Sequence, residues 1–257
     1  MATTSFDAIV IGGGACGLMC AVQAGMRGKR VLVLERNNRP GAKIAISGGG
    51  RCNYTNLYTS INNFVSADPG FAAVAFSQWT VQDTIDFFAR YGIMGKEKTR
   101  GQLFPVSDRA KDVVAVFARL LRQYGQELRT HCLVQAVNRL RDGRFEVVYT
   151  RSGREERETA GAVVVASGGL PVAKLGASDL GLRIARQFGL AVVSTAPALV
   201  PLTITGKDAG WFAALAGNSV FCRVSNSRIS FEENILFTHW GLSGPAILQL
   251  SSYWRPS

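Results

Sequence analysis

The opening of the chain alternates short apolar segments with glycines in a pattern that predicts a strand, a helix and a second strand. Residues 6–11 are mostly apolar, include β-branched side chains and are followed by three glycines, so they predict a buried strand and a turn. Residues 15–27 are small and apolar and stop before Gly28, as expected of a helix. A second apolar run covers residues 31–35. This order predicts a βαβ unit with parallel strands and a right-handed crossover.

Further along the chain, the same reasoning predicts a functional loop followed by alternating helices and strands. Residues 41–56 are rich in Gly, Ser and Asn, which indicates a loop of the kind that carries function. Helices are expected at 71–91, 108–124 and 179–188, and strands at 128–140, 144–149 and 161–166. After Pro197 the pattern changes to short strands and turns. We therefore predict an α/β, Rossmann-like domain over residues 1–194 and a partial β-rich domain over residues 195–257.

Composition narrows the class of protein. Apolar residues make up 47% of the 257 residues and charged residues 18%, which is typical of a globular chain. No apolar run is long enough for a membrane span and the N-terminus does not resemble a signal peptide, so we expect a cytoplasmic protein without membrane contacts. The odd count of five cysteines, without C-x-x-C spacing, and the two histidines predict neither a disulfide framework nor a metal site.

The formal net charge of +11 indicates either an anionic partner, such as a nucleotide, a carboxylate or a nucleic acid, or a solvated surface whose charge a partner or a missing segment balances. The basic residues are spread along the chain and do not form one block, which is weak evidence for nucleic-acid binding. On this basis we expect a small, anionic substrate and consider a nucleic-acid partner disfavoured.

The glycine turn after the first predicted strand has the spacing of a dinucleotide-binding motif. Gly12, Gly14 and Gly17 fit G-x-G-x-x-G, in which the glycines allow the tight turn, the approach of the pyrophosphate and close packing of helix on strand. The helix that follows would present free N–H groups to the phosphates. Glu35 ends the next predicted strand, where a carboxylate accepts hydrogen bonds from ribose and repels a 2′-phosphate. FAD or NAD is therefore favoured over NADP, although Arg36 weakens this discrimination.

Four further positions carry candidate chemistry, three in the loop and one near the C-terminus. Lys43 and Arg51 place cations within the predicted loop, suited to phosphate or reduced flavin. Cys52 is either a redox thiol or a small residue packed beside the cofactor. His239 is either a general acid or a structural residue in a turn.

Gly-Gly-Gly-Arg-Cys-Asn-Tyr-Thr-Asn at residues 48–56 is the most specific of several motifs that follow one another along the chain. The other segments are residues 101–110, 166–169, 197–202 and 236–246. Together these motifs resemble the YhiN-like flavoproteins, which are bacterial FAD-dependent oxidoreductases also described as aminoacetone oxidase-like or bile-acid reductase-like. The ordered set covers nearly the whole chain and is more specific than any one motif.

The resemblance implies a flavoprotein of the two-dinucleotide-binding-domain type, in which an inserted β-rich domain interrupts the FAD-binding domain. It also implies that this β-rich domain is incomplete at the C-terminus and that the family's C-terminal return to the FAD domain is missing. The implied cofactor is FAD, with NAD(P)H as a possible electron donor. The candidate cofactor-binding residues are Gly12, Gly14, Ala15, Gly17, Glu35, Arg36, Lys43, Ser47, Gly49, Arg51, Cys52, Asn53, Val134, Ser167 and Gly168.

Three functions stay open at this point. The first is an FAD-dependent oxidoreductase that acts on a small molecule, with the flavin carrying hydride or electrons. The second is an RNA-modifying flavoprotein, related to flavin enzymes that act on tRNA and suggested by the positive charge. The third is a protein that keeps the nucleotide-binding fold without turnover.

Overall fold

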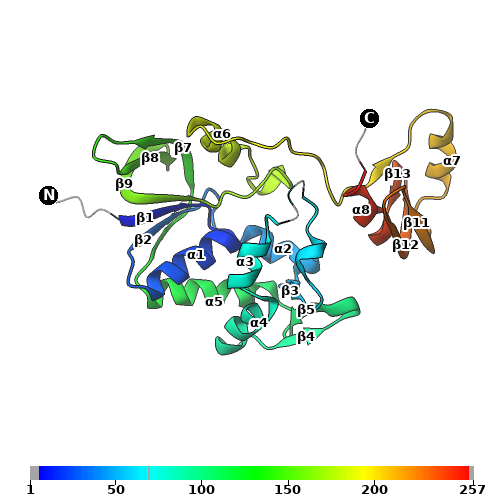
Figure 1. Ribbon diagram of the computed structural model, residues 1–257, viewed down its shortest axis with the longest axis horizontal. Helices are drawn as coiled ribbons and strands as arrows, with labels where there is room; N and C mark the ends of the chain where they lie inside the picture. The colour runs from blue at the N-terminus through cyan, green and yellow to red at the C-terminus, as the bar shows by residue number, and fades with distance from the viewer. Residues whose placement is uncertain (1–5, 67, 69, 255–257) are drawn as a thin grey trace. The chain divides into compact units, whose positions relative to one another are not determined.

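The computed structural model describes residues 6–66, 68 and 70–254, which form two compact units (Figure 1). The first unit comprises the described residues up to Ser60 together with Val74–Val192. The second comprises the described residues of Ile61–Ala73 together with those from Val193 onwards. Residues 61–73 therefore group with the second unit, whereas the sequence analysis placed them within the first domain.

The first unit is organised by a mixed sheet with the strand order β6-β2-β1-β9-β8-β7. Its strands are β1 (Phe6–Ile11), β2 (Val31–Leu34), β6 (Glu127–Arg129), β7 (Cys132–Arg139), β8 (Phe145–Arg151) and β9 (Arg154–Val165). Strand β1 pairs in parallel with β2 and β9, and β2 pairs in parallel with β6, whereas β7, β8 and β9 form an antiparallel meander. Ala160 of β9 lies opposite Phe145 of β8 and also opposite Phe6 of β1, so β9 belongs to both the meander and the parallel sheet.

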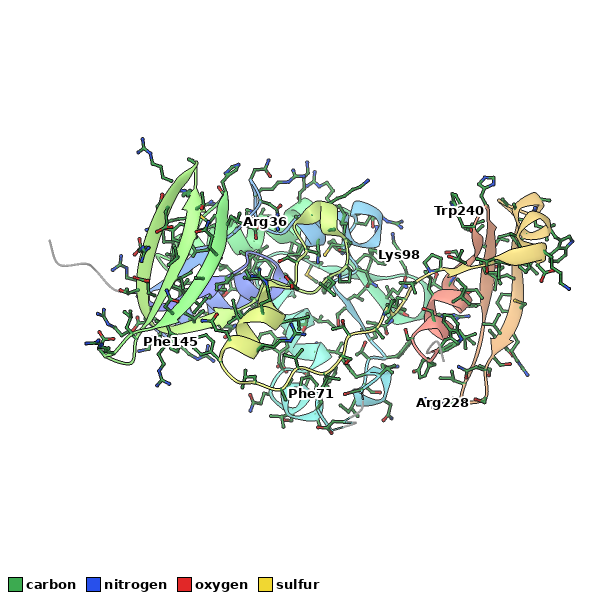
Figure 2. The ribbon with its side chains drawn as sticks, turned by 90° about the horizontal axis from the view of Figure 1, so that it is seen from above. Arg36, Phe71, Lys98, Phe145, Arg228 and Trp240 are labelled. Atoms are coloured by element: carbon green, nitrogen blue, oxygen red, sulfur yellow. The ribbon has the colours of Figure 1, made fainter. Side chains whose placement is uncertain are left out.

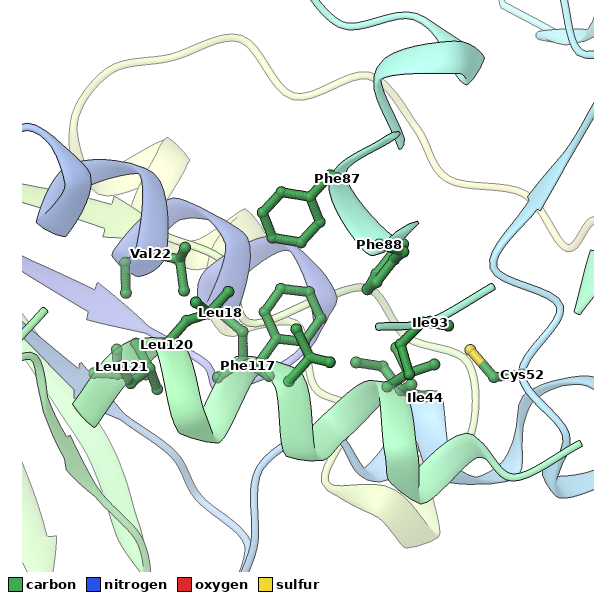
Figure 3. Close-up of a cluster of buried hydrophobic side chains, with 14 of the residues drawn as sticks. Leu18, Val22, Ile44, Cys52, Phe87, Phe88, Ile93, Phe117, Leu120 and Leu121 are labelled. Carbon is green, nitrogen blue, oxygen red and sulfur yellow. The ribbon is translucent and has the colours of Figure 1, made fainter. Parts of the chain in front are cut away.

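Helices cover one face of this sheet and the meander lies against the other (Figure 1). Helices α1 (Ala15–Met26) and α5 (Ala110–Gln123) pack on the first face with α4 (Val81–Arg90). Figure 3 shows Leu18 of α1, Phe117 of α5 and Phe88 of α4 in this core. On the other face, Ile184 of α6 (Leu180–Gln187) packs with residues of β1, β2, β7 and β8. All of β2 and four of the six residues of β1 are buried, as parallel strands covered on both faces require.

Two expected elements are interrupted for local reasons. The helix predicted at 71–91 is two helices, α3 (Ala73–Gln78) and α4. Thr80 between them has extended backbone angles, and its side chain and that of Asp83 exchange hydrogen bonds with each other's backbone N–H groups in a capping box. The strand predicted at 128–140 breaks into β6 and β7 at His131, whose φ is +58°.

The segment predicted as a loop at 41–56 begins as a helix. Helix α2 (Ala42–Gly50) is regular as far as Ile46, and then Ser47, Gly48 and Gly49 leave the helical conformation. It leads into a small antiparallel sheet with the order β3-β5-β4, made of β3 (Thr55–Asn56), β5 (Gln102–Pro105) and β4 (Gly95–Glu97). Glycines at 48 and 49, with φ of +55° and +68°, allow this change of direction.

The second unit contains an antiparallel sheet with the order β10-β13-β12-β11. Its strands are β10 (Leu202–Thr203), β11 (Ser219–Ser225), β12 (Ser230–Thr238) and β13 (Gly241–Ser243). Helices α7 (Ala209–Ala214) and α8 (Pro245–Ser251) pack against this sheet.

Short one-turn 3₁₀ segments lie at Ile61–Asn63, Thr99–Gly101, Ala173–Leu175 and Gly206–Asp208. Among the described residues, no helix is long and apolar enough to cross a bilayer.

Candidate functional site

A cavity of about 720 Å³ opens in the first unit where three parallel strands reach their carboxyl ends. Ile11 ends β1 and Gly12 follows it, Leu34 ends β2 and Glu35 follows it, and Ala166 follows β9. Ligands of open α/β sheets bind at this edge, and the volume lies in the range of cofactor sites. The position of the cavity therefore follows from the order and direction of the strands.

The three glycines of the turn have different structural roles. Gly12 has a φ of +108°, and a Cβ atom on it would lie 2.4 Å from the carbonyl oxygen of Ala166. A Cβ atom on Gly17 would lie 1.9 Å from the carbonyl oxygen of Gly12, so this glycine lets α1 pack against the turn. Gly14 caps α1, lines the cavity and would find no atom within 4 Å of an added Cβ. The turn thus offers backbone and open space at Gly14, where a phosphate could approach.

The Glu35 carboxylate is held in place at the end of β2. Its side chain is only 7% exposed, and Oε2 accepts a hydrogen bond of 2.7 Å from the Gly13 N–H. Oε1 accepts bonds of 2.7 Å from the Asn37 backbone N–H and 2.8 Å from the Asn37 amide. These bonds fix the carboxylate at the cavity wall and leave one of its about four lone-pair positions, on Oε2, for a further donor such as a ribose hydroxyl.

The segment after β2 forms a second wall. The Gly41 N–H donates to the Gly13 carbonyl oxygen over 2.8 Å, which joins the start of α2 to the glycine turn. Lys43 and Ser47 of α2 line the cavity, and Cys52 lies just beyond them. Cys52 is 4% exposed with a φ of +63°. Burial raises the pKa of the Cys52 thiol, and a hydrogen bond with Ser47 offsets part of that rise, so the thiol is protonated at neutral pH.

The third wall carries a buried hydroxyl without a partner. Ser167, just after β9, lines the cavity, and its Oγ has no hydrogen-bond partner among the described residues. Because buried polar atoms are nearly always paired, this oxygen indicates a place for a ligand. Arg36, Lys43 and Arg183 bring positive charge to the lining, against the single carboxylate of Glu35. The residues present fit a dinucleotide with a diphosphate.

Most residues predicted to bind the cofactor line this cavity. They are Gly12, Gly14, Ala15, Glu35, Arg36, Lys43, Ser47, Cys52, Asn53, Val134, Ser167 and Gly168. Gly17, Gly49 and Arg51 are not among the lining residues. Gly17 is buried beneath the turn. The Arg51 Nε donates to the Gly48 carbonyl oxygen over 3.0 Å, and its guanidinium lies over the Phe104 ring instead of the cavity.

His239, predicted as a candidate acid, is exposed between β12 and β13 in the second unit. Its role stays a prediction, as do the individual roles of the cavity residues.

Sequence reasoning missed part of the lining. Asn37, which orients Glu35, stands three residues after the end of β2, and a polar residue at that place was the available signal. Tyr54, Phe88 and Phe117 line an apolar part of the cavity and come from separate elements. The segment 175–178 with Leu180 and Arg183 closes the side near α6. These contacts arise from tertiary packing, which no local pattern reports.

Residues 6–244 match the HI0933-like protein Rossmann domain family. The chain belongs to this family. The match confirms the predicted resemblance, the Rossmann-like α/β fold and FAD as the cofactor of the family. Among solved structures, the fold is similar to that of the 3-ketosteroid-delta4-(5alpha)-dehydrogenase of Rhodococcus jostii RHA1, with a TM-score of 0.51 and 18% identity. That similarity covers 65% of this chain and 46% of the dehydrogenase.

Three curated proteins of this family are similar in sequence. The ribosomal RNA dihydrouridine synthase of Escherichia coli (strain K12) is 41% identical over 253 residues, which is 98% of this chain and 62% of that protein. Its counterpart in Haemophilus influenzae is 36% identical over 97% of this chain and 62% of its own length. The 3-dehydro-bile acid delta(4,6)-reductase of Clostridium scindens is 29% identical over 95% of this chain and 59% of its own length. The chain thus spans about three-fifths of these relatives.

Proposed function

We propose that this chain is the FAD-binding part of a reductase that adds hydrogen across the C5–C6 double bond of uridine in ribosomal RNA. The observation that carries the proposal is the 41% identity, over 98% of this chain, with a protein named ribosomal RNA dihydrouridine synthase. A second relative with the same name, at 36% identity, supports it. The cavity supports the cofactor half of the proposal, because its glycine turn, carboxylate and cations suit a dinucleotide.

The chemistry requires one hydride and one proton. In uracil the C5–C6 double bond is conjugated to the C4 carbonyl, so hydride adds at C6 and a proton completes C5. Reduced FAD, when bound, would supply the hydride, and NAD(P)H is the proposed source of the electrons. The chain's own task is to hold the dinucleotide, exclude water and deliver the proton.

The cavity residues divide these tasks. The N–H groups at the start of α1, next to Gly14, and the Lys43 ammonium bind the diphosphate. Glu35 would accept a hydrogen bond from a ribose hydroxyl. Ser167 completes its hydrogen bonding with the ligand. Cys52 is a protonated thiol in the cavity wall, which suits a proton donor better than a thiolate nucleophile.

The spread of basic residues along the chain led us to consider a nucleic-acid partner disfavoured, and the proposed RNA substrate reverses that expectation. That expectation rested on linear sequence, whereas RNA meets a folded surface on which distant cations come together. The net charge of +11 supports an RNA partner once the relatives' names are considered.

A second candidate function is the reduction of a small conjugated ketone. The relative named 3-dehydro-bile acid delta(4,6)-reductase, at 29% identity, favours it. Its substrate, by name, has carbon–carbon double bonds and an oxidised position 3, so both candidates reduce a double bond conjugated to a carbonyl. They differ in the size and charge of the substrate and not in the chemistry.

The test uses the purified chain loaded with FAD, NADPH, and ribosomal RNA made by transcription, which contains no dihydrouridine. After digestion, mass spectrometry of the nucleosides should detect uridine with two added hydrogens, and the yield should require both FAD and NADPH. A 3-oxo-4,6-diene steroid acid serves as the competing substrate. Reduction of the steroid without reduction of RNA favours the second candidate, and reduction of neither contradicts the proposal.

A further inference from the structure

The small sheet of the first unit carries a group of cations around one aromatic ring. Lys96 lies directly opposite Phe104 in the register of β4 and β5, and Lys98 follows two residues later on the same side. The Lys98 ammonium lies 4.5 Å from the Phe104 ring centroid, and the Arg51 guanidinium carbon lies 5.4 Å from it. We refer to Arg51, Lys96, Lys98, Phe104 and Asp108 as the Phe104 face.

Positive charge is in excess on the Phe104 face. Asp108 is its one carboxylate and accepts hydrogen bonds from both lysines, at 3.0 Å from Lys98. Arg51 is exposed and makes no ion pair among the described residues, and its Nε is engaged by the Gly48 carbonyl oxygen. The terminal guanidinium nitrogens therefore remain available to an anion. Phe104 itself is 4% exposed, so the ring orients the cations and offers no surface for base stacking.

The Phe104 face is continuous with the cavity through residues 47–53. Ser47 and Asn53 line the cavity, whereas Gly48, between them in the chain, packs on Phe104. A Cβ atom on Gly48 would lie 2.6 Å from the Phe104 ring, so this contact requires glycine. Arg51 belongs to the same segment and turns its side chain away from the cavity onto the ring. An elongated anion that enters the cavity beside Asn53 would therefore extend toward Arg51 and toward Lys98, the second of which is labelled in Figure 2.

We propose that the Phe104 face binds the phosphate backbone of the RNA substrate and positions the strand at the cavity. This inference rests on the proposed function. Phosphate contacts of this kind fix the position of a strand without reading its sequence, and pairs of guanidinium and ammonium groups on a rigid support provide them. The face differs from the cations inside the cavity, which suit the diphosphate of the cofactor.

The test compares RNA binding by the variant Arg51→Gln/Lys98→Gln with that of the unmodified chain. The probe is a fluorescently labelled, uridine-containing single-stranded RNA, followed by anisotropy over a series of salt concentrations. Loss of two phosphate contacts should weaken binding about 25-fold at ~0.1 M salt and should reduce the slope of log K against log salt by about 1.4. FAD affinity, followed by flavin fluorescence, should not change, because neither side chain lines the cavity.

The matched control is Arg141→Gln/Arg154→Gln, which removes two exposed cations from the turns of the β7-β8-β9 meander. This variant has the same net charge as the test variant and should bind RNA nearly as the unmodified chain does. Equal losses in both variants would show a general effect of charge and overturn the proposal. No loss in the test variant, or no RNA binding by the unmodified chain at low salt, would overturn it too.

The two proposals fail separately. If RNA binding depends on Arg51 and Lys98 but no dihydrouridine forms, the proposed reaction is wrong. The proposal that the Phe104 face binds phosphate then stands. If the Arg51→Gln/Lys98→Gln variant forms dihydrouridine equally well and its RNA affinity is unchanged, the proposed reaction stands. The proposal that the Phe104 face binds phosphate is then wrong. If the variant loses binding of the steroid acid and not of RNA, the face serves a small carboxylate and the proposal is wrong.

Discussion

Glu35 provides the single negative charge of the cavity lining in the described chain, and its carboxylate already accepts three hydrogen bonds. We expect Glu35→Gln to weaken FAD binding by about ten- to a hundredfold, since hydrogen bonds to a charged group contribute roughly 1.5–3 kcal/mol. Titration of flavin fluorescence measures the effect. Glu155→Gln, on the exposed meander, is the control. Unchanged affinity in Glu35→Gln would place the ribose elsewhere.

The glycines at 14 and 17 allow a comparison of folding with binding. Gly17→Ala brings a methyl group against the Gly12 carbonyl oxygen and should destabilise the protein by about 1–3 kcal/mol. Gly14→Ala meets open space and should cost only about 0.5 kcal/mol, as a change of capping residue, while weakening FAD binding. Urea unfolding without cofactor, followed by FAD titration, separates the two effects. If Gly14→Ala binds FAD normally, the phosphates do not approach at that position.

The Cys52 thiol should react slowly with alkylating agents. Burial raises its pKa, so the folded protein holds the thiol proton more tightly than the unfolded chain does. The resulting stabilisation is fully present below the unfolded pKa, about 8.5, and is lost as the pH rises through the higher folded pKa. Iodoacetamide at pH 8 should modify the exposed Cys16 before Cys52, as peptide mass spectrometry can show. Rapid labelling of Cys52 would instead support the redox-thiol interpretation.

Among the elements, α4 depends on its capping box and brings Phe88 to the cavity. Thr80→Ala removes the side chain that accepts the Asp83 N–H and should lower the free energy of unfolding by about 1 kcal/mol. Chemical denaturation measures this change, and Gln82→Ala, on the same helix, is the control. An equal loss in the control would show that the effect is not specific to the cap, because Ala is a better helix former than Gln.

The same box makes the start of α4 sensitive to acid. Hydrogen bonds from the Thr80 hydroxyl and N–H hold the pKa of Asp83 below its usual range. Its contribution is present above the unfolded pKa of about 3.9 and is lost as the pH falls through the lower folded value. Unfolding curves measured down the acid range should show this loss in the unmodified chain and not in Asp83→Asn. If the stability of Asp83→Asn depends on pH in the same way as that of the unmodified chain, Asp83 is not the source of the loss in acid.

Local patterns were sufficient where one element has one clear period. The apolar positions Val113, Val116 and Phe117 recur at helical spacing, and α5 forms there. Local patterns were insufficient at 71–91, where a continuous apolar pattern concealed the Thr80 cap. They were also insufficient at 41–56, where the glycines concealed a short helix. The glycine motif and Glu35 predicted the nucleotide half of the cavity because both lie within one βαβ unit. The apolar half unites α1, α4 and α5, so only the fold assembles it.

For the whole molecule, FAD should stabilise the unit that contains the cavity. At a concentration about 100 times its Kd, a ligand that binds only the folded state adds about 2.7 kcal/mol of stability. Hydrogen exchange followed by mass spectrometry should therefore slow at residues 12–17, 35–37 and 132–134, which include cavity-lining positions. Adenosine alone, at the same concentration, is the control and should protect less. Protection confined to the second unit would contradict the assigned site.

The division of β9 between two sets of partners has a consequence during synthesis of the protein. Ile9 of β1 pairs with Val163 of β9, so one edge of the first strand stays unpaired until a much later part of the chain has left the ribosome. Such long-range parallel pairing forms slowly, and an open apolar strand edge attracts other chains meanwhile. The meander β7-β8-β9, whose contacts are local, can form first and deliver residues 160–165 ready for pairing. The nascent chain is thus most exposed to aggregation before this hairpin array emerges, which is the interval in which a chaperone would help it.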